Sequence, residues 1–387
     1  MQQDQTVQKA LERARQAHAG LQAWLVQDAY PVWSTQGFDA LHRSFHERIG
    51  ALGPVVEDPR RARVAARQVY AFARAPSLGW SGPARQLVEA GLAFFLDRYR
   101  RPDGLFRTLV AAGGAPLDER VWLYDQAFAL LALASCQQVL GAQPVLMEEG
   151  AQLRDALYGR LRRSRGFGSG LSEPLPLLSN PHMHLFESAL AWQAVTTDPA
   201  WQDLAGEIGA LALEKLIQHH GGLPELFDEH WAVLPEGTKG QAIEPGHQFE
   251  WCWLLLCWDA GRQGAAHRAA ARLFEIGSGR GLANGVAVNA LRADFSVQDA
   301  ATRLWPQTEW LKAASLLGAL TGEPRYWESA AAAAAALRRF LDHPVRGLWH
   351  DKLTAAGEFM SEPAPASSLY HIVCAIGEFG AALERAG

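Results

Sequence analysis

Most of the chain has the pattern of helices of two kinds, separated by short segments rich in Gly and Pro. In one kind, such as DPAWQDLAGEIGALALEKLIQ (198–218), apolar residues recur every three or four positions and charged residues fill the opposite face. This pattern is typical of a helix that covers a core on one side. In the other kind, such as WCWLLLCWDA (251–260), apolar residues occur all round the helix, which indicates burial on every side. The alternating pattern of a half-buried strand is almost absent.

The two kinds of helix alternate along the chain, which predicts a particular architecture. The expected helices are 8–29, 56–76, 82–98, 118–140, 145–163, 181–196, 198–218, 243–262, 264–277, 303–321, 324–342 and 365–385. The odd members are amphipathic and the even members apolar, so we expect six outer and six inner helices in an all-α (α/α)6 barrel. Because no linker-like segment divides the chain, we expect residues 1–387 to form a single catalytic domain.

Polar side chains gather in the first turns of the expected inner helices. They are Arg63, Arg67, Tyr124, Asp125, Asn180, His182, His184, Glu187, His247, Glu250, Gln307, Glu309 and His371. Consecutive helices of such a barrel run antiparallel, so the inner helices all run parallel and begin at the same end. We therefore expect a polar pocket at that end. Six helix dipoles point their positive ends into it and favour a ligand that carries or develops negative charge.

Each of these residues can also be interpreted as a structural residue with no part in catalysis or binding. A buried His with a Glu three residues later is more often a hydrogen-bonded core pair than a catalytic one, although His184–Glu187 and His247–Glu250 repeat the spacing. His182 cannot share a helix face with His184 and is placed at the rim. Trp305 is expected in the pocket wall. The loop 222–231, with Glu225, Phe227, Asp228 and Trp231, could cover the pocket.

Composition and charge narrow the class of ligand. The net charge is −5 and no run of Lys and Arg stands out in the sequence, which argues against nucleic-acid binding. Neither a signal-peptide pattern nor an apolar stretch of about 20 residues occurs, so we expect a cytoplasmic protein without membrane contact.

The four cysteines form no CxxC motif and are expected to be buried thiols. A His-rich metal site is conceivable, but no local motif such as HExxH occurs and the helix dipoles disfavour a cation, so no metal and no cofactor are expected.

Taken together, several of these segments resemble those of a known family. Arg67 and the segments YDQAF (124–128), NPHMHLFE (180–187), EPGHQFEW (244–251), WPQTE (305–309) and YHI (370–372) are similar, in the same order, to the N-acylglucosamine 2-epimerase family. That family includes cellobiose 2-epimerases, mannose 2-epimerases, mannose isomerases and sulfoquinovose isomerases, and its (α/α)6 fold agrees with the helix count.

The resemblance implies proton transfer at the carbon next to a sugar carbonyl, without metal or redox cofactor. The enediolate that forms needs a base of near-neutral pKa and donors for its oxyanion. By similarity, His247 and His371 are the acid/base residues, and Glu250 orients the His247 imidazole and raises its basicity. The same resemblance assigns substrate binding to Arg67, Tyr124, Asn180, His184, Glu187, Trp305 and Glu309.

The resemblance also favours one branch of the family. The stretch 366–371 (ASSLYH) lacks the Trp and Lys of the W-K-x-P-Y-H pattern of cellobiose epimerases, and YPVWSTQGFD (30–39) resembles the mannose and sulfoquinovose isomerases. We therefore expect an isomerase that acts on a free monosaccharide, with D-mannose to D-fructose first. A 2-epimerase, a glycoside hydrolase that uses Glu187, Glu250 or Glu309, and a helical binding scaffold are the alternatives. A homodimer is possible.

Overall fold

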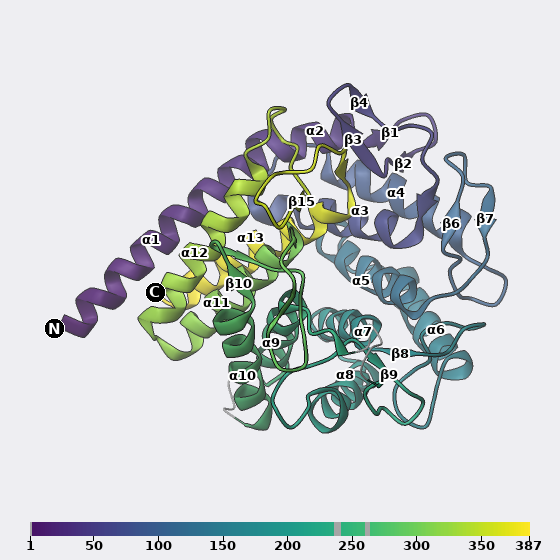
Figure 1. Ribbon diagram of the computed structural model, residues 1–387. Coiled ribbons are helices and arrows are strands. Elements are labelled where there is room, and N and C mark those ends of the chain that lie inside the picture. Colours follow the sequence, from purple (N-terminus) through teal and green to yellow (C-terminus); the bar gives the residue numbers. More distant parts are fainter. Residues whose placement is uncertain (1, 236–240, 260–263) are drawn as a thin grey trace.

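Helices in two concentric rings account for most of the computed structural model, which describes residues 2–235, 241–259 and 264–387 (Figure 1). The inner ring contains α3 (Ala62–Arg74), α5 (Leu123–Leu140), α7 (Ser179–Gln193), α9 (Pro245–Asp259), α11 (Trp305–Thr321) and α13 (Ser367–Arg385). The outer ring contains α1 (Gln2–Trp24), α4 (Ala84–Tyr99), α6 (Pro144–Arg160), α8 (Pro199–Leu211), α10 (Ala265–Arg280) and α12 (Pro324–Leu341). Each inner helix packs against the next, and α13 packs against α3 to close the ring. The (α/α)6 barrel expected from the sequence is confirmed.

Four short helical segments complete this description. A π-helical turn, η1 (Leu25–Ala29), joins α1 to α2 (Tyr30–Thr35), and a second one, η3 (Ala212–Leu216), extends α8. A 3-10 turn, η2 (Pro76–Leu78), follows α3. Among the described residues, no helix has the length and apolar character needed to span a membrane.

The two kinds of helical pattern correspond to the two rings. On α11, every residue from Pro306 to Gly318 is buried, as its lack of a polar face predicts. On α12, buried residues such as Trp327, Ala330 and Ala334 recur every three or four positions, and the opposite face is exposed. Burial on both sides of the inner ring therefore accounts for the continuous apolar runs.

Most expected helix ends agree with the structure to within about three residues, as such boundaries generally do. Three of the expected helices begin at a different residue. The expected helix 56–76 begins at Ala62 and the expected helix 118–140 begins at Leu123, because short strands precede both. The expected helix 8–29 begins at Gln2 and continues, through η1, to Thr35. The last residues of the expected helix 243–262 lie outside the described residues.

Very short strands, which the sequence did not predict, line the loops before the inner helices. They are β1 (Phe38–Asp39), β2 (Ser44–Phe45), β3 (Arg48–Gly50), β4 (Gly53–Pro54), β5 (Arg60–Arg61), β6 (Leu109–Val110), β7 (Pro116–Asp118), β8 (Leu177–Leu178), β9 (Leu226–Phe227), β10 (Leu282–Ala283), β11 (Val286–Ala287), β12 (Ala290–Leu291), β13 (Val297–Asp299), β14 (Thr302–Arg303), β15 (Lys352–Leu353) and β16 (Ala364–Pro365). All pair antiparallel, in the orders β1-β2, β16-β3-β4, β5-β6-β7, β8-β9, β10-β11, β12-β13 and β14-β15. Strands of two or three residues are too short for an alternating pattern to show.

Buried glutamines on the inner helices hold these loops in place. Gln126 accepts a hydrogen bond from the backbone N–H of Phe106 and donates one to its carbonyl, both at 2.8 Å. Gln248 does the same with Leu223, both at 2.9 Å, and Gln307 with Ala287, at 2.8 and 3.0 Å. A buried amide that satisfies both groups of a loop residue fixes the backbone there. The loops above the inner helices are thus tied to the ring that they cover.

Candidate active site

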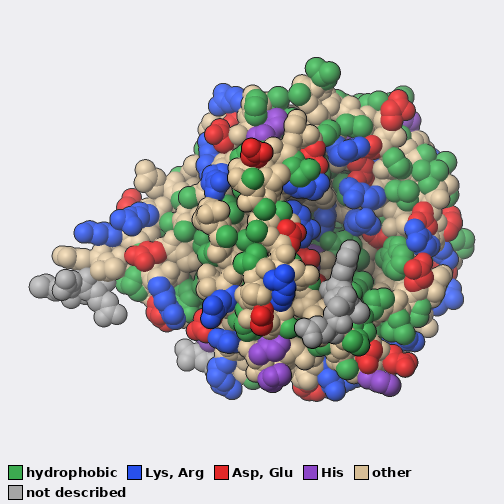
Figure 2. Space-filling view, in the orientation of Figure 1, with side chains coloured by type: hydrophobic (Ala, Val, Ile, Leu, Met, Phe, Trp, Pro, Cys, Tyr) green, Lys and Arg blue, Asp and Glu red, His purple; other side chains and the backbone are tan. Residues whose placement is uncertain are grey.

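The N-terminal turns of the inner helices surround a cavity of about 310 Å³. It is lined by Arg67, Tyr124, Asn180, His184, Glu244, His247, Glu250, Arg303, Trp305, Asp351, Lys352, Ser367, Ser368 and His371. A wider space of about 870 Å³ adjoins it and shares five of these residues. The space-filling view shows a hollow in this face with Lys and Arg side chains around it (Figure 2). Of the site residues expected from the sequence, Glu187 and Glu309 lie behind this lining and the others belong to it.

His247 has a different partner from the one expected. Its Nδ1 lies 2.8 Å from Oε1 of Glu225, in the loop before β9, and 3.9 Å from Glu244. The expected partner Glu250 makes no hydrogen bond to His247, because its side chain is directed toward the inner helix α7 instead. Burial lowers the pKa of His247, but the negative charges of Glu225 and Glu244 outweigh burial and raise that pKa to about 9. His247 is therefore a cation at neutral pH.

His371 lies in the opposite electrostatic environment. Its Nδ1–H donates to Oε1 of Glu309 at 2.8 Å, and Oε2 of Glu309 lies 2.5 Å from Nζ of Lys312. Burial, with the positive charges of Arg67 and Lys312, lowers the pKa of His371 well below its ordinary value. His371 is therefore neutral, and because Nδ1 is bound to Glu309, Nε2 is the nitrogen left for a ligand.

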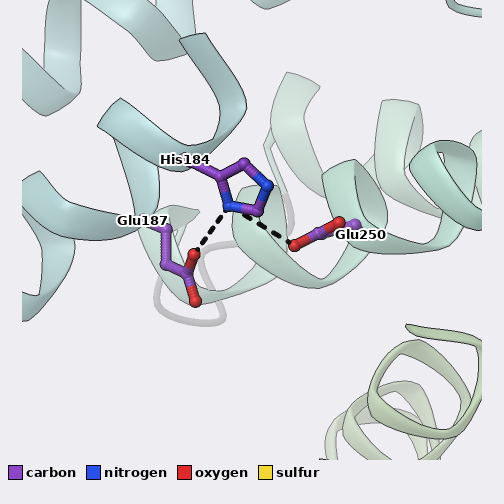
Figure 3. Close-up of side chains that lie close together, drawn as sticks. All are labelled: His184, Glu187 and Glu250. Carbon is purple, nitrogen blue, oxygen red and sulfur yellow. Dashed lines mark hydrogen bonds and ion pairs between the residues drawn. The ribbon is translucent and has the colours of Figure 1, made fainter. Parts of the chain in front are cut away.

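A third histidine belongs to a cluster of buried carboxylates. Nδ1 of His184 lies 3.1 Å from Oε2 of Glu187 and 3.8 Å from Oε1 of Glu250 (Figure 3). The Tyr370 hydroxyl donates to Glu187, 2.5 Å from both carboxylate oxygens. Burial lowers the pKa of His184 to about 4, against the opposite effect of Glu187. His184 is neutral and held in one orientation by Glu187.

The two carboxyl groups of this cluster differ in charge. Burial would raise the pKa of Glu187, but the hydrogen bond with His184, the Lys312 charge and the Tyr370 hydroxyl bring it below its ordinary value. Both oxygens of Glu250 are buried without a hydrogen-bond partner. Burial and the neighbouring Glu309 carboxylate raise the pKa of Glu250 well above 4.5. Glu187 is thus an acceptor and Glu250 a proton-bearing acid that faces the cavity.

Arg67 and Asn180 offer polar groups that the protein itself leaves without partners. Nη2 of Arg67 donates to the Tyr124 hydroxyl at 2.6 Å, and its guanidinium lies 4.1 Å from the centre of the Phe128 ring. Its Nε is buried without a partner, as is Oδ1 of Asn180. Buried polar atoms without partners are uncommon and costly. Their position at the cavity indicates that a ligand completes their hydrogen bonds.

Three groups of side chains have the composition of metal ligands. In the part of the chain that the structure describes they are His184, Glu187 and Glu250 (Figure 3), then Glu225, Glu244 and His247, and Glu250, Glu309 and His371, with ligand atoms within 4.8 Å of one another in each. Carboxylates of the first and third groups already have an ammonium group, that of Lys312, beside them, and the second contains the His247 cation. Because a positively charged side chain already lies beside the carboxylates of each group, a metal ion is less favoured there. The expectation that no metal is needed stays a prediction.

Other residues singled out in the sequence have structural positions. His182 belongs to the core and not to the rim, because its Nδ1 bonds the Leu178 carbonyl at 2.8 Å and its Nε2 accepts from the Phe167 N–H at 3.0 Å. Arg63 pairs with Asp125 at 3.2 Å in the adjoining space. Trp231, from the loop 222–231, is buried beside His182.

Two functional candidates, Glu225 and Lys312, were not assigned a role from the sequence. Glu225 is in a loop, where periodicity gives no direction for a side chain. Lys312 did carry a signal, because it is a single lysine in an otherwise apolar helix, three residues after Glu309. That spacing places both on the same helix face.

Comparison with known proteins identifies the family of the chain. The N-acylglucosamine 2-epimerase (GlcNAc 2-epimerase) family model matches residues 44–375. The chain is 48% identical over 379 residues to a mannose-6-phosphate isomerase of Rhizobium meliloti (strain 1021), covering 94% of this chain and 97% of that protein. It is 28% identical over 378 residues to a D-mannose isomerase of Thermobifida fusca, covering 88% of each. The cellobiose 2-epimerase of Spirochaeta thermophila DSM 6192 has the same fold, with a TM-score of 0.84 at 23% identity over 96% of this chain and 97% of that one. The chain therefore belongs to the N-acylglucosamine 2-epimerase family and is a sugar isomerase or epimerase.

Proposed function

We propose that the protein is an aldose–ketose isomerase that converts free D-mannose to D-fructose through an enediolate. The observation that carries the proposal is that two histidines line one cavity and bond different carboxylates: Nδ1 of His371 bonds Glu309, beside the Lys312 ammonium group, and Nδ1 of His247 bonds Glu225. These surroundings lower the pKa of His371 and raise that of His247. The Trp305 ring contacts both, with ring centres 4.9 Å from His247 and 5.7 Å from His371. A neutral imidazole can take a proton, and a cationic one can donate it, so the pair supplies a base and an acid.

The reaction then divides between the two residues. Nε2 of His371 takes the proton from C2 of the open-chain sugar, and the electron pair of that bond forms the C1=C2 double bond of the enediolate. His247 donates its proton to O1, where the negative charge develops. His371 returns its proton to C1, while O2 gives its hydroxyl proton back to His247 and becomes the carbonyl oxygen of fructose. Protons and charge balance, and both histidines return to their starting states.

The remaining cavity residues bind the sugar oxygens in this account. Arg67, Tyr124 and Asn180 offer groups that a sugar can satisfy, and the protonated Glu250 donates a hydrogen bond to an oxygen. Donors fixed in a buried site stabilise a developing oxyanion without having to reorganise. His184 is also buried, and its Nδ1 is bound to Glu187. Its Nε2 is therefore the nitrogen available to the ligand.

The charges around the cavity favour a neutral sugar over a sugar phosphate. Arg303 pairs with Glu244 at 2.9 Å, Lys352 with Glu362 at 2.9 Å, and Arg63 with Asp125 at 3.2 Å. Each of these three cations already has a carboxylate partner, which a phosphate would have to displace. Arg67 has no carboxylate partner, but its guanidinium is held by the Tyr124 hydroxyl and the Phe128 ring. Mannose 6-phosphate is nevertheless the second candidate substrate, because the relative that is 48% identical is named for it.

Two other activities fit less well. A 2-epimerase needs His247 to protonate the opposite face of C2, which a cationic imidazole can do, so it stays the alternative within the family. A glycoside hydrolase needs two available carboxyl groups on either side of a bond. Glu187 is bound by Tyr370 and His184, and Glu309 by Lys312 and His371, which counts against such a pair.

Steady-state kinetics test the proposal. The purified protein should form fructose from mannose, and kcat/KM for mannose should exceed that for mannose 6-phosphate; the reverse order would overturn the free-sugar assignment. His371→Asn should reduce kcat by about 10²–10⁴-fold, the usual contribution of one acid/base residue. A near-normal rate in that variant would remove His371 from the mechanism.

A further inference from the structure

Lys312 is a buried lysine in the middle of an inner helix, below the cavity. It lies three residues after Glu309 on α11, and its side chain is 0% exposed. A buried ammonium group persists only where charges and hydrogen bonds compensate for lost hydration. Lys312 is close to the carboxylates of Glu187 on α7 and Glu309 on its own helix, and to the Glu250 side chain on α9. The two carboxylates explain how its charge is stabilised.

The Lys312 ammonium group is connected to His371 through the Glu309 carboxylate. Nζ lies 2.5 Å from Oε2 of Glu309, whose Oε1 accepts the Nδ1–H of His371 at 2.8 Å. The Trp253 ring, with its centre 3.9 Å from Nζ, and the Cys374 sulfur, 3.8 Å away, occupy other sides of the ammonium group. Burial raises the pKa of the Cys374 thiol to about 12, so this neighbour is neutral. Lys312 is thus connected to the cavity through one carboxylate and one imidazole.

The other histidine shows what a carboxylate does without a lysine. Glu225 bonds Nδ1 of His247 at 2.8 Å, the same distance and nitrogen as in the Glu309–His371 pair. No ion pair of Glu225 with a Lys or Arg occurs among the residues that the structure describes. His247 has a raised pKa and His371 a lowered one, although both are buried and both bond a carboxylate. The two pairs differ in the charges beside them: Arg67 and the Lys312 ammonium group lie near His371, and a second carboxylate, Glu244, lies 3.9 Å from His247. Of these groups, Lys312 is the cation in contact with the carboxylate of the pair itself.

We propose that Lys312 is a positioning residue that neutralises Glu309 and so keeps His371 uncharged, with Nε2 free to act as the base. This inference rests on the proposed function for its catalytic meaning, but not for the charge state that it assigns. It explains why the two carboxylate–histidine pairs of one cavity can take opposite roles. Lys312 itself touches neither the cavity nor the substrate, and acts through Glu309.

The charged and titratable groups around His371 are consistent with this role. From the other inner helices these are Arg67 on α3, His184 and Glu187 on α7, Glu250 on α9, and Glu309 and Lys312 on α11, with Tyr370 and Cys374 on its own helix. Asp351 and Lys352 face the same cavity from the loop before α13. The largest positive contributions come from Arg67 and then Lys312. Arg67 is held by Tyr124 and is not bonded to Glu309, so Lys312 is the cation that its substitution removes from the Glu309 pair.

The test is a titration of His371 in the full-length protein by NMR of labelled histidines, with the His371 signal identified by its loss in His371→Asn. In the wild type, the titration midpoint of His371 should lie well below that of an ordinary histidine. In Lys312→Met, which removes the charge and keeps the length, the titration midpoint should rise by about 1–3 units, as expected for a lost neighbouring charge. The acidic limb of the kcat profile should move to higher pH by a similar amount. A folded Lys312→Met protein with an unchanged midpoint would overturn the proposal.

Two further variants keep the test decisive if Lys312→Met does not fold, as judged by circular dichroism and gel filtration. Lys312→Arg keeps the charge and should keep the low midpoint. Glu309→Gln removes the carboxylate and keeps Lys312, so its midpoint should stay low while kcat falls; a midpoint that rises in Glu309→Gln would contradict the proposal. The NMR titration needs no substrate. If the wild type fails to convert mannose but His371 titrates as described, the proposed reaction fails and the role of Lys312 stands.

Discussion

Glu225, a loop residue, lies 2.8 Å from Nδ1 of His247, although Glu250 is the acid one helical turn away. The histidine thus takes its hydrogen-bonded carboxylate from the loop that precedes β9 and not from its own helix. That loop is tied to α9 by the two hydrogen bonds between Gln248 and Leu223, two residues before Glu225. The Ser179 N–H also donates to the Glu225 carbonyl at 3.1 Å, and its hydroxyl to the carboxylate at 3.2 Å. Glu225 is therefore fixed well enough to act as a permanent partner of His247.

The first prediction concerns the alkaline limb of the pH profile. His247 is protonated below its pKa of about 9, so a reaction that uses it as an acid should lose rate as the pH rises through that value. In Glu225→Gln the pKa of His247 should fall by about 1–3 units because a neighbouring negative charge is lost. The alkaline limb of kcat/KM should then move to lower pH. Glu229→Gln, an exposed acid of the same loop, is the matched control and should leave the profile unchanged.

The site is less predictable from the sequence than the fold, and the pairings show why. Periodicity places His247 and His371 at the starts of inner helices because the helix repeat fixes which residues share a face. The direction of a side chain within the barrel depends on its neighbours across the ring, so the spacing of His247 and Glu250 gave the wrong partner. Glu225 and the two-residue strands lie in segments without a repeat, where only tertiary hydrogen bonds determine the position.

The second prediction contrasts two buried glutamates of the same cluster. Glu250 is protonated, so Glu250→Gln replaces one neutral hydrogen-bond donor by another and should lower kcat/KM less than tenfold, which is about 1.4 kcal/mol of transition-state stabilisation. Glu187 is ionised and accepts from both Tyr370 and His184. Because an amide cannot replace both acceptor oxygens, Glu187→Gln should lower the free energy of unfolding by about 1–3 kcal/mol. Denaturant unfolding and steady-state kinetics measure the two effects. A loss in kcat/KM of much more than tenfold in Glu250→Gln would contradict the protonated state of Glu250.

The third prediction concerns the space that Gly246 leaves for Trp305. A Cβ at position 246 would lie 2.5 Å from two atoms of the Trp305 ring, which contacts both histidines. Gly246→Ala should therefore displace the ring and raise KM for the sugar, with a fall in kcat. Gly279→Ala is the control, since a Cβ there meets nothing within 4 Å on an exposed part of α10. The control should keep normal kinetics and gain a little stability, because Ala favours a helix over Gly. Normal KM and kcat in Gly246→Ala would show that the position of Trp305 is unimportant.

The central claim, isomerisation by proton transfer between C2 and C1, is tested most directly by proton NMR in D2O. The EDTA-treated protein would be supplied separately with mannose, glucose, fructose and N-acetylglucosamine. We predict that fructose grows from mannose, that deuterium enters at C1 or C2, and that EDTA leaves the rate unchanged. Glucose growing from mannose without any ketose would contradict the account and identify a 2-epimerase.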